Sequence, residues 1–178
     1  MKNFIMFLTY LRIIFGPIIL MSTIFFEAYW AAFWLFCISA LTDYFDGVLA
    51  RKLNLVSKLG SILDPIADKV LVVFALIAVL ILTNDSYVAI MASLILAREF
   101  WVSGLREQSA RNKTEDVTKV TFLAKIKTTV QFVAISLYFY SAAANLALIA
   151  LIANFVLFLA MLLSLKTGLD YTRNTFRS

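Results

Sequence analysis

Asp43-Tyr44-Phe45-Asp46-Gly47-Val48-Leu49-Ala50-Arg51 opens a stretch that places four carboxylates inside an otherwise apolar sequence. Eight residues later the same stretch continues with Gly60, Asp64 and Asp68. At about 100° per residue on a helix, Asp43, Gly47 and Ala50 share one stripe. Gly60, Asp64 and Asp68 lie one turn apart on a single face of a second helix. Two helices that face each other in this way bring four carboxylates into one small volume.

Carboxylates in a membrane span need a compensating charge, because each ionised Asp costs about 2.5–3.5 kcal/mol there. Hard divalent cations such as Mg²⁺ and Mn²⁺ take carboxylate oxygens as ligands. The chain has no His and one Cys, so zinc or iron would be poorly supplied with ligands. The pattern therefore predicts a site for Mg²⁺ or Mn²⁺ with the ligands Asp43, Asp46, Asp64 and Asp68.

Three small residues, Gly47, Ala50 and Gly60, are interleaved with these carboxylates. Bare backbone beside a metal lets a bulky phosphorylated ligand approach closely. The alternative is that the small residues serve close helix packing, as they do in membranes. Their interleaving with four Asp favours the ligand interpretation.

The full pattern, D-x2-D-G-x2-A-R-x8-G-x3-D-x3-D over residues 43–68, resembles the signature of the CDP-alcohol phosphatidyltransferase family. The resemblance implies a membrane enzyme in which an alcohol attacks the β-phosphate of a CDP-linked lipid and CMP leaves. It also implies two divalent cations on the four Asp, with Asp68 acting in addition as general base, and a homodimer. The residues implied to bind CDP are Gly47, Ala50, Arg51, Gly60 and Asp64.

Composition agrees with a membrane location. Of 178 residues, 62% are apolar and 15% are charged, which excludes an ordinary soluble domain. The apolar runs predict one all-α domain over residues 1–178, a bundle of six transmembrane helices at about 4–26, 29–51, 59–82, 87–105, 120–140 and 145–165. The net charge of +5 indicates affinity for anionic lipid, with no need for a nucleic-acid partner.

Basic residues are concentrated in every second predicted loop along the chain. The connections near Glu27, Asn84 and Ala143 contain no Lys or Arg. The opposite set of loops and ends holds Lys2, Arg51, Lys52, Lys58, Arg106, Arg111, Lys113, Lys119, Lys166, Arg173 and Arg177. By the positive-inside rule, both termini and the mouth of the carboxylate site face the cytoplasm, in the inner (cytoplasmic) membrane.

Arg106, Lys125 and Lys127 lie near the same predicted interface. Arg binds phosphate through two parallel hydrogen bonds and Lys binds it as a point charge, so these residues are predicted to hold a phosphorylated acceptor. The alternative is that lysines near a helix end extend to the interface and bind nothing.

Further motifs sharpen the resemblance. They resemble the branch of the family that transfers the phosphatidyl group of CDP-diacylglycerol to sn-glycerol 3-phosphate: Asn3, Thr9, Arg12, Pro17, Asp64-Pro65-x-Ala67-Asp68-Lys69, Arg98-Glu99, Ser103-Gly104-Leu105-Arg106 and Lys125-x-Lys127-Thr128-x2-Gln131.

Two alternatives remain open. The same chemistry with another acceptor would make the chain a cardiolipin synthase or a phosphatidylinositol phosphate synthase. A different class is a small divalent-cation transporter, because Asp residues inside a membrane also mark ion pathways. Against the transporter, the carboxylates gather at one interface and do not line a route across.

Overall fold

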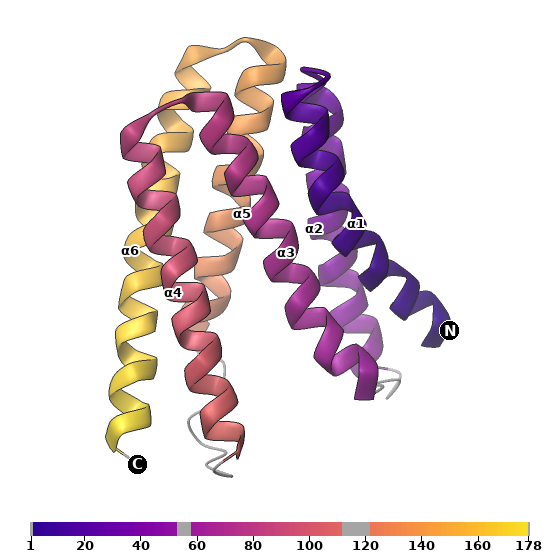
Figure 1. Ribbon diagram of the computed structural model, residues 1–178, viewed down its shortest axis with the longest axis vertical. Helices are drawn as coiled ribbons and strands as arrows, with labels where there is room; N and C mark the ends of the chain where they lie inside the picture. Colours follow the sequence, from indigo (N-terminus) through magenta and orange to yellow (C-terminus); the bar gives the residue numbers. More distant parts are fainter. Residues whose placement is uncertain (1, 53–57, 112–121, 178) are drawn as a thin grey trace.

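The computed structural model describes residues 2–52, 58–111 and 122–177, and these residues form six helices (Figure 1). The all-α prediction is confirmed for this part of the chain. The helices are α1 (Lys2–Ile24), α2 (Tyr29–Lys52), α3 (Lys58–Thr83), α4 (Ser86–Arg111), α5 (Phe122–Ala144) and α6 (Ala147–Arg177). Their starts lie within about two residues of the predicted ones, while α4, α5 and α6 continue further than predicted.

Short connections join the helices at the end of the bundle opposite to the start of α1 (Figure 1). Each contains a residue in the left-handed region, namely Glu27 (φ 47°), Asn84 (φ 47°) and Asn145 (φ 54°). Asn tolerates this conformation better than most residues, so Asn84 and Asn145 suit their turns. Asp85 then caps α4, because its carboxylate accepts a hydrogen bond of 2.7 Å from the backbone N–H of Tyr87.

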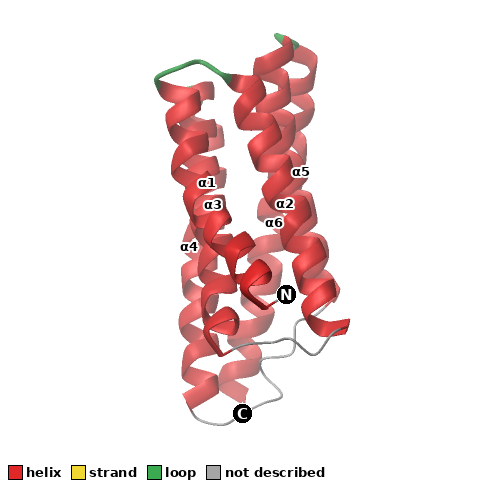
Figure 2. Cartoon of the chain, turned by 90° about the vertical axis from the view of Figure 1, so that its right-hand side faces the viewer, coloured by secondary structure: helices red, strands yellow, loops and turns green. Residues whose placement is uncertain are grey.

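The helices pack in two groups of three. α1 contacts α2 and α3, while α6 contacts α4 and α5, and α2 joins the groups through α5. The two groups separate toward the end where α1 begins and α6 ends (Figures 1 and 2). At the closed end and through the middle, a continuous core includes Ile19, Phe36, Leu76, Ile135 and Leu157. The bundle is therefore tightly packed away from the open end.

Large apolar side chains also cover the outside of the bundle, for example Phe7, Trp34, Ile90, Leu151 and Phe155. Such exposure is expected where the surrounding solvent is lipid, since lipid tails are as apolar as Leu. Within the described residues, four helical segments are long and apolar enough to cross a membrane: Met6–Ile24, Ile62–Thr83, Ser86–Ser109 and Ala147–Phe176. The chain is thus a multi-pass membrane protein.

The prediction of six spans is supported in part. Over their described residues, the two other helices, α2 and α5, contain no segment that is both long enough and apolar enough to count as a membrane span by the same measure. In α5, Lys127 and Gln131 interrupt the apolar sequence, and both side chains are buried inside the bundle. Helix α5 therefore has polar residues directed toward the protein interior, and its membrane crossing stays a prediction.

Helix α6 extends twelve residues beyond its predicted end at 165. The extra turns pack on α4, where Arg98 donates to Thr167 (2.7 Å), Arg106 to Tyr171 (2.7 Å) and Trp101 to Thr172 (3.0 Å). The apolar pattern located the membrane span and missed this extension, because the last turns are held by polar contacts with a distant helix.

Candidate active site

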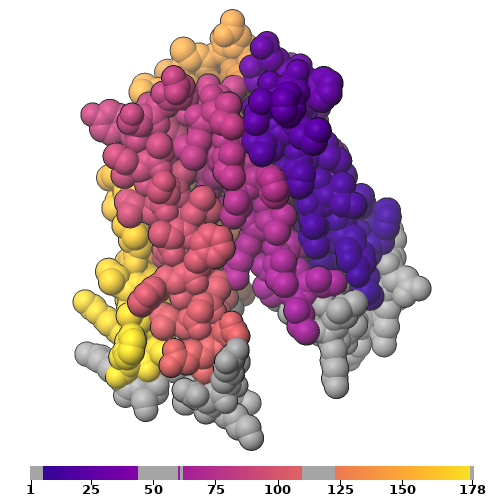
Figure 3. All heavy atoms as spheres, in the orientation of Figure 1, coloured from indigo at the N-terminus to yellow at the C-terminus, as the bar shows by residue number. Residues whose placement is uncertain are grey.

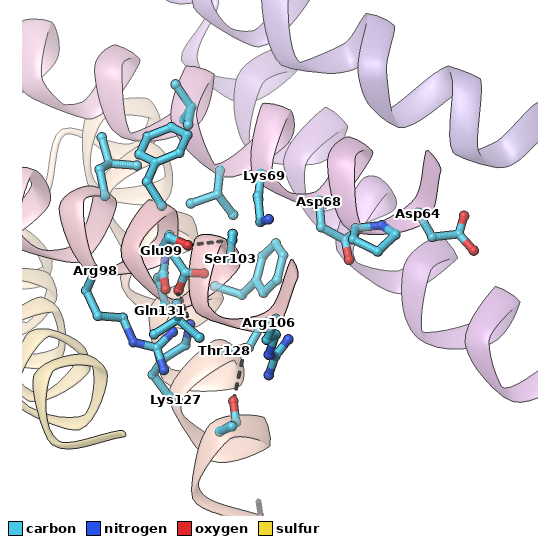
Figure 4. Close-up of a pocket in the computed structure, with 18 residues that line it drawn as sticks. Asp64, Asp68, Lys69, Arg98, Glu99, Ser103, Arg106, Lys127, Thr128 and Gln131 are labelled. Atoms are coloured by element: carbon cyan, nitrogen blue, oxygen red, sulfur yellow. Dashed lines mark hydrogen bonds and ion pairs between the residues drawn. The ribbon is translucent and has the colours of Figure 1, made fainter. Parts of the chain in front are cut away.

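A cavity of about 330 Å³ lies between α3, α4 and α5. Figure 3 shows the molecule hollowed between α3 and α4 toward the open end of the bundle. The polar side chains that line the cavity are Asp64, Asp68, Lys69, Arg98, Glu99, Ser103, Arg106, Lys127, Thr128 and Gln131. Figure 4 shows the two carboxylates of α3 on one side and the side chains of α4 and α5 on the other. The cavity therefore joins an acidic wall to a largely basic wall.

The acidic wall is supplied by Asp64 and Asp68 of α3, and Asp43 of α2 lies beside them. Asp64 and Asp68 lie one helical turn apart on α3, and Asp43 approaches them from α2 through a shared contact with Arg12. All three side chains are partly exposed: 36% for Asp43, 43% for Asp64 and 41% for Asp68. The carboxylates are thus held by protein on one side and accessible on the other.

Arg12 of α1 lies at the centre of this group and is 1% exposed. Its Nη1 donates to Asp43 and to Asp68, the latter at 2.7 Å, and its Nη2 lies 3.8 Å from Asp64. Thr9, on the same helix, donates a hydrogen bond of 2.6 Å to Asp64. The family pattern includes Arg12 and Thr9, but their contacts with the carboxylates were not predicted from the sequence. The sequence feature that could have indicated these contacts is the presence of an Arg and a Thr three residues apart in an apolar helix.

Carboxylate oxygens from two helices lie close together here, and they are the type of ligand that hard divalent cations prefer. Among the described side chains, however, no three acidic, His or Cys residues form a ready-made metal-binding group. Asp43, Asp64 and Asp68 each contact the Arg12 guanidinium. The fourth predicted ligand, Asp46, has a side chain outside the described residues.

The predicted CDP-binding residues are described only in part. The structure gives the helical course of α2 through Gly47, Ala50 and Arg51, whose side-chain surroundings lie outside the described residues. Gly60 is buried in the first turn of α3, one turn before Asp64. Asp64 lines the cavity. This geometry is compatible with a ligand site beside the carboxylates, and the CDP assignment stays a prediction.

The basic wall centres on a buried ion-pair network. Lys127 of α5 donates to Glu99 of α4, and Arg98 lies 3.2 Å from the same carboxylate oxygen. Arg98 also donates to Thr167 of α6 at 2.7 Å, so the network ties three helices together. Lys127 and Arg98 are 5% and 8% exposed. The sequence indicated only a structural ion pair between Glu99 and its neighbour Arg98, which the structure contains, and the contact of Glu99 with Lys127, 28 residues away, was not predicted.

Arg106 and Lys125, the other residues predicted to hold the acceptor phosphate, differ in their placement. Arg106 lines the cavity, donates to the hydroxyl of Tyr171 at 2.7 Å and lies over its ring, 4.9 Å from the centroid. Lys125 is exposed and is not among the residues that line the cavity. The structure therefore brings Arg106 and Lys127 to one cavity and leaves Lys125 outside it.

A multi-pass helical bundle in which carboxylates of α3 face cations of α4 and α5 across a cavity defines a membrane protein with a charged internal site. Residues 3–165 match the model of the CDP-alcohol phosphatidyltransferase family. The chain belongs to the CDP-alcohol phosphatidyltransferase family.

Similar curated proteins share one name, CDP-diacylglycerol–glycerol-3-phosphate 3-phosphatidyltransferase. The protein from Rickettsia bellii (strain RML369-C) is 43% identical over 138 residues, which cover 77% of this chain and 74% of the relative. The protein from Cereibacter sphaeroides is 45% identical over 139 residues, covering 74% and 61%. The protein from Escherichia coli (strain K12) is 42% identical over 106 residues, covering 60% and 58%.

Proposed function

We propose that the chain transfers the phosphatidyl group of CDP-diacylglycerol to sn-glycerol 3-phosphate, giving phosphatidylglycerophosphate and CMP. The family match and the shared name of the similar proteins support this reaction. The structural observation that carries it is the cavity between α3, α4 and α5, which joins Asp64 and Asp68 to Arg106 and Lys127. A site for two anionic substrates needs both a charge-neutralising group and a phosphate-binding group.

The reaction replaces one phosphate–oxygen bond by another. The free hydroxyl oxygen of glycerol phosphate bonds to the phosphorus that carries the diacylglycerol, and the bond from that phosphorus to the CMP oxygen breaks. We assign Asp68 as the general base that takes the hydroxyl proton, since it lines the cavity and is partly exposed. The electron pair of the broken bond leaves with CMP.

Asp43, Asp46, Asp64 and Asp68 are the residues that would hold divalent cations, Mg²⁺ or Mn²⁺. When bound, two such ions supply neutralisation of the pyrophosphate and polarisation of the reacting phosphorus. Gly47, Ala50, Arg51, Gly60 and Asp64 are proposed to surround the CDP group. The oxygen-only donor set supports this assignment, because hard cations prefer such ligands.

Arg106 and Lys127 are proposed to hold the phosphate of the acceptor. Both line the cavity on the side opposite the carboxylates, where a phosphate would lie away from the like charges of Asp64 and Asp68. Arg98 and Lys69 add positive charge to the same cavity. Lys125 was predicted to share this role, and its exposed position outside the cavity lining gives that assignment no support.

We further propose six membrane spans, including α2 and α5, with both termini and the open end of the cavity at the cytoplasmic face of the inner membrane. The start of α1 and the end of α6 lie at one end of the bundle, as an even number of spans requires (Figure 1). The basic loops support the orientation. A homodimer, implied by the family resemblance, is proposed as the oligomeric state.

CMP release from CDP-diacylglycerol in detergent micelles tests the function. We expect release that requires both a divalent cation and sn-glycerol 3-phosphate. Inositol phosphate, phosphatidylglycerol and serine serve as competing acceptors in parallel reactions. Release with one of these and none with glycerol phosphate would retain the family chemistry and overturn the acceptor assignment.

A further inference from the structure

Arg12 is the most deeply buried cation in the described part of the chain, and its partners come from two other helices. The guanidinium contacts Asp43 on α2 and both Asp64 and Asp68 on α3. These contacts span 31 and 56 residues of sequence. Arg12 therefore connects all three helices of one half of the bundle at the carboxylate site.

The carboxylates around Arg12 outnumber its single positive charge. One guanidinium cannot neutralise three carboxylates, and carboxylates gathered in a membrane protein repel one another strongly when their charge is not compensated. Arg12 is always charged, so it supplies its compensation whether or not a metal is present. The same carboxylates are the proposed ligands for divalent cations, which would compensate the remaining charge.

We propose that Arg12 is the internal counter-ion of this site: it holds Asp43, Asp64 and Asp68 together without metal, and divalent cations compete with it for the carboxylates. Arg12 is thus a positioning residue that keeps the ligand set assembled and lowers its affinity for metal. This inference rests on the proposed metal site. It predicts that loss of Arg12 harms the metal-free protein more than the metal-loaded protein.

Thermal unfolding of the full chain in detergent, followed by circular dichroism, tests the proposal. Wild type and Arg12→Met are compared in a chelator and across a titration of Mn²⁺. The long apolar side chain of Met retains much of the packing volume of Arg and removes its charge. We expect Arg12→Met to lower Tm strongly in chelator and much less at saturating Mn²⁺, so that the Mn²⁺-induced rise in Tm is larger than in wild type. The Mn²⁺ concentration at half-maximal effect should fall about tenfold.

Two further variants separate a counter-ion from an ordinary structural contact. Arg98→Met removes another buried Arg that pairs with a carboxylate, Glu99, and it should lower Tm equally with and without Mn²⁺. Arg12→Lys keeps the charge and should restore most of the stability in chelator. If Arg12→Met does not fold, Thr9→Val, which removes the hydrogen bond to Asp64, should show the same Mn²⁺ dependence to a smaller degree.

An equal loss of Tm with and without Mn²⁺ for Arg12→Met would overturn the proposal, and so would an equal loss for Thr9→Val if it is the variant that folds. Failure of the proposed function has a different signature. A folded wild-type chain that neither responds to Mn²⁺ in Tm nor releases CMP in its presence would overturn the metal site itself. Ion-dependent CMP release combined with an equal loss of Tm would overturn the role of Arg12 alone.

Discussion

At the scale of single residues, Asp68 accepts a hydrogen bond of 2.7 Å from Arg12 and also lines the cavity that contains Arg106 and Lys127. A general base needs access to the substrate hydroxyl and a fixed orientation. Asp68 has both features, because one side of its carboxylate is held by Arg12 while about two fifths of the side chain remains exposed.

Replacement of Asp68 by Asn tests this assignment. Asn keeps the shape of the side chain and cannot accept the hydroxyl proton, so kcat should fall about 10²- to 10⁴-fold. Binding of CDP-diacylglycerol should remain within a few-fold of wild type. Equilibrium binding of the lipid nucleotide and CMP release are measured on the same preparation. Near-normal turnover would contradict the assignment of Asp68 as base.

Lys127 and Lys125 form a matched pair for testing the acceptor pocket. They lie two residues apart on α5, and Lys127 is buried in the cavity wall while Lys125 is exposed. Lys127→Ala should raise KM for glycerol phosphate tenfold or more, since a charge-assisted hydrogen bond contributes about 1.5–3 kcal/mol. The KM for CDP-diacylglycerol should change much less. Lys125→Ala should leave both constants near wild type.

Steady-state kinetics with each substrate varied in turn makes this measurement. If Lys127→Ala raises both KM values equally, or if Lys125→Ala has the larger effect on glycerol phosphate, the acceptor phosphate binds elsewhere. The tertiary structure makes this comparison possible, because sequence spacing alone predicted the same role for both lysines.

At the scale of helices, each half of the bundle is joined by its own polar network. Arg12 ties α1 to α2 and α3, while Arg98, Glu99, Lys127 and Thr167 tie α4 to α5 and α6. Hydrogen bonds and ion pairs matter for helix association in lipid, where apolar surfaces gain little by leaving their surroundings. The two networks thus hold the two walls of the cavity in place.

Gly168 and Gly104 provide a test of the contact between α6 and α4. A Cβ at Gly168 would lie 2.8 Å from Cγ of Arg98, whereas a Cβ at Gly104 meets nothing within 4 Å. Ala gains about 0.8–1 kcal/mol of helix propensity over Gly at either site. Gly168→Ala should nevertheless be less stable than Gly104→Ala by about 1–3 kcal/mol, because Arg98 must move.

The measurement is Tm in detergent for both variants, together with KM for glycerol phosphate. Because Arg98 pairs with Glu99, which in turn holds Lys127, Gly168→Ala should also raise this KM. Gly104→Ala is the control for the change in helix propensity. Equal stability of the two variants would show that α6 does not press on Arg98.

At the scale of the whole molecule, the two halves meet closely at one end and separate at the other (Figures 1 and 3). The separation produces the cavity and places it toward the end where α1 begins and α6 ends. An amphiphilic substrate needs such a position, because its nucleotide is soluble in water while its acyl chains remain in lipid. The proposed cytoplasmic orientation would let CDP and glycerol phosphate enter from the same compartment.

Cysteine labelling tests this orientation. Cys37 is the one Cys in the sequence, so Cys37→Ala gives a background into which Ser86→Cys or Asn174→Cys can be introduced. Both positions are exposed, at opposite ends of the bundle. In intact spheroplasts, a membrane-impermeant maleimide should label Ser86→Cys and should label Asn174→Cys only after lysis. The reverse pattern would invert the topology.

The sequence alone was sufficient to predict the class of the protein and the position of the carboxylates in the acidic wall. Apolar runs predicted the helices because lipid requires long apolar segments whose backbone groups are satisfied internally. The spacing of Asp64 and Asp68 placed both on one face of α3, because this geometry is local to a single helix. The ends of α4 and α6 were missed, since polar contacts between the two helices stabilise their last turns.

The tertiary structure alone decided which charges lie beside one another. Arg12 meets Asp43 and Asp68, and Glu99 meets Lys127, because of how helices distant in sequence pack. Coulomb interactions depend on separation in space, and helical periodicity specifies neighbours only within one helix. The sequence thus determined a membrane bundle that carries a family's carboxylate motif, and the packing of its helices determined the cation that holds those carboxylates and the cavity they face.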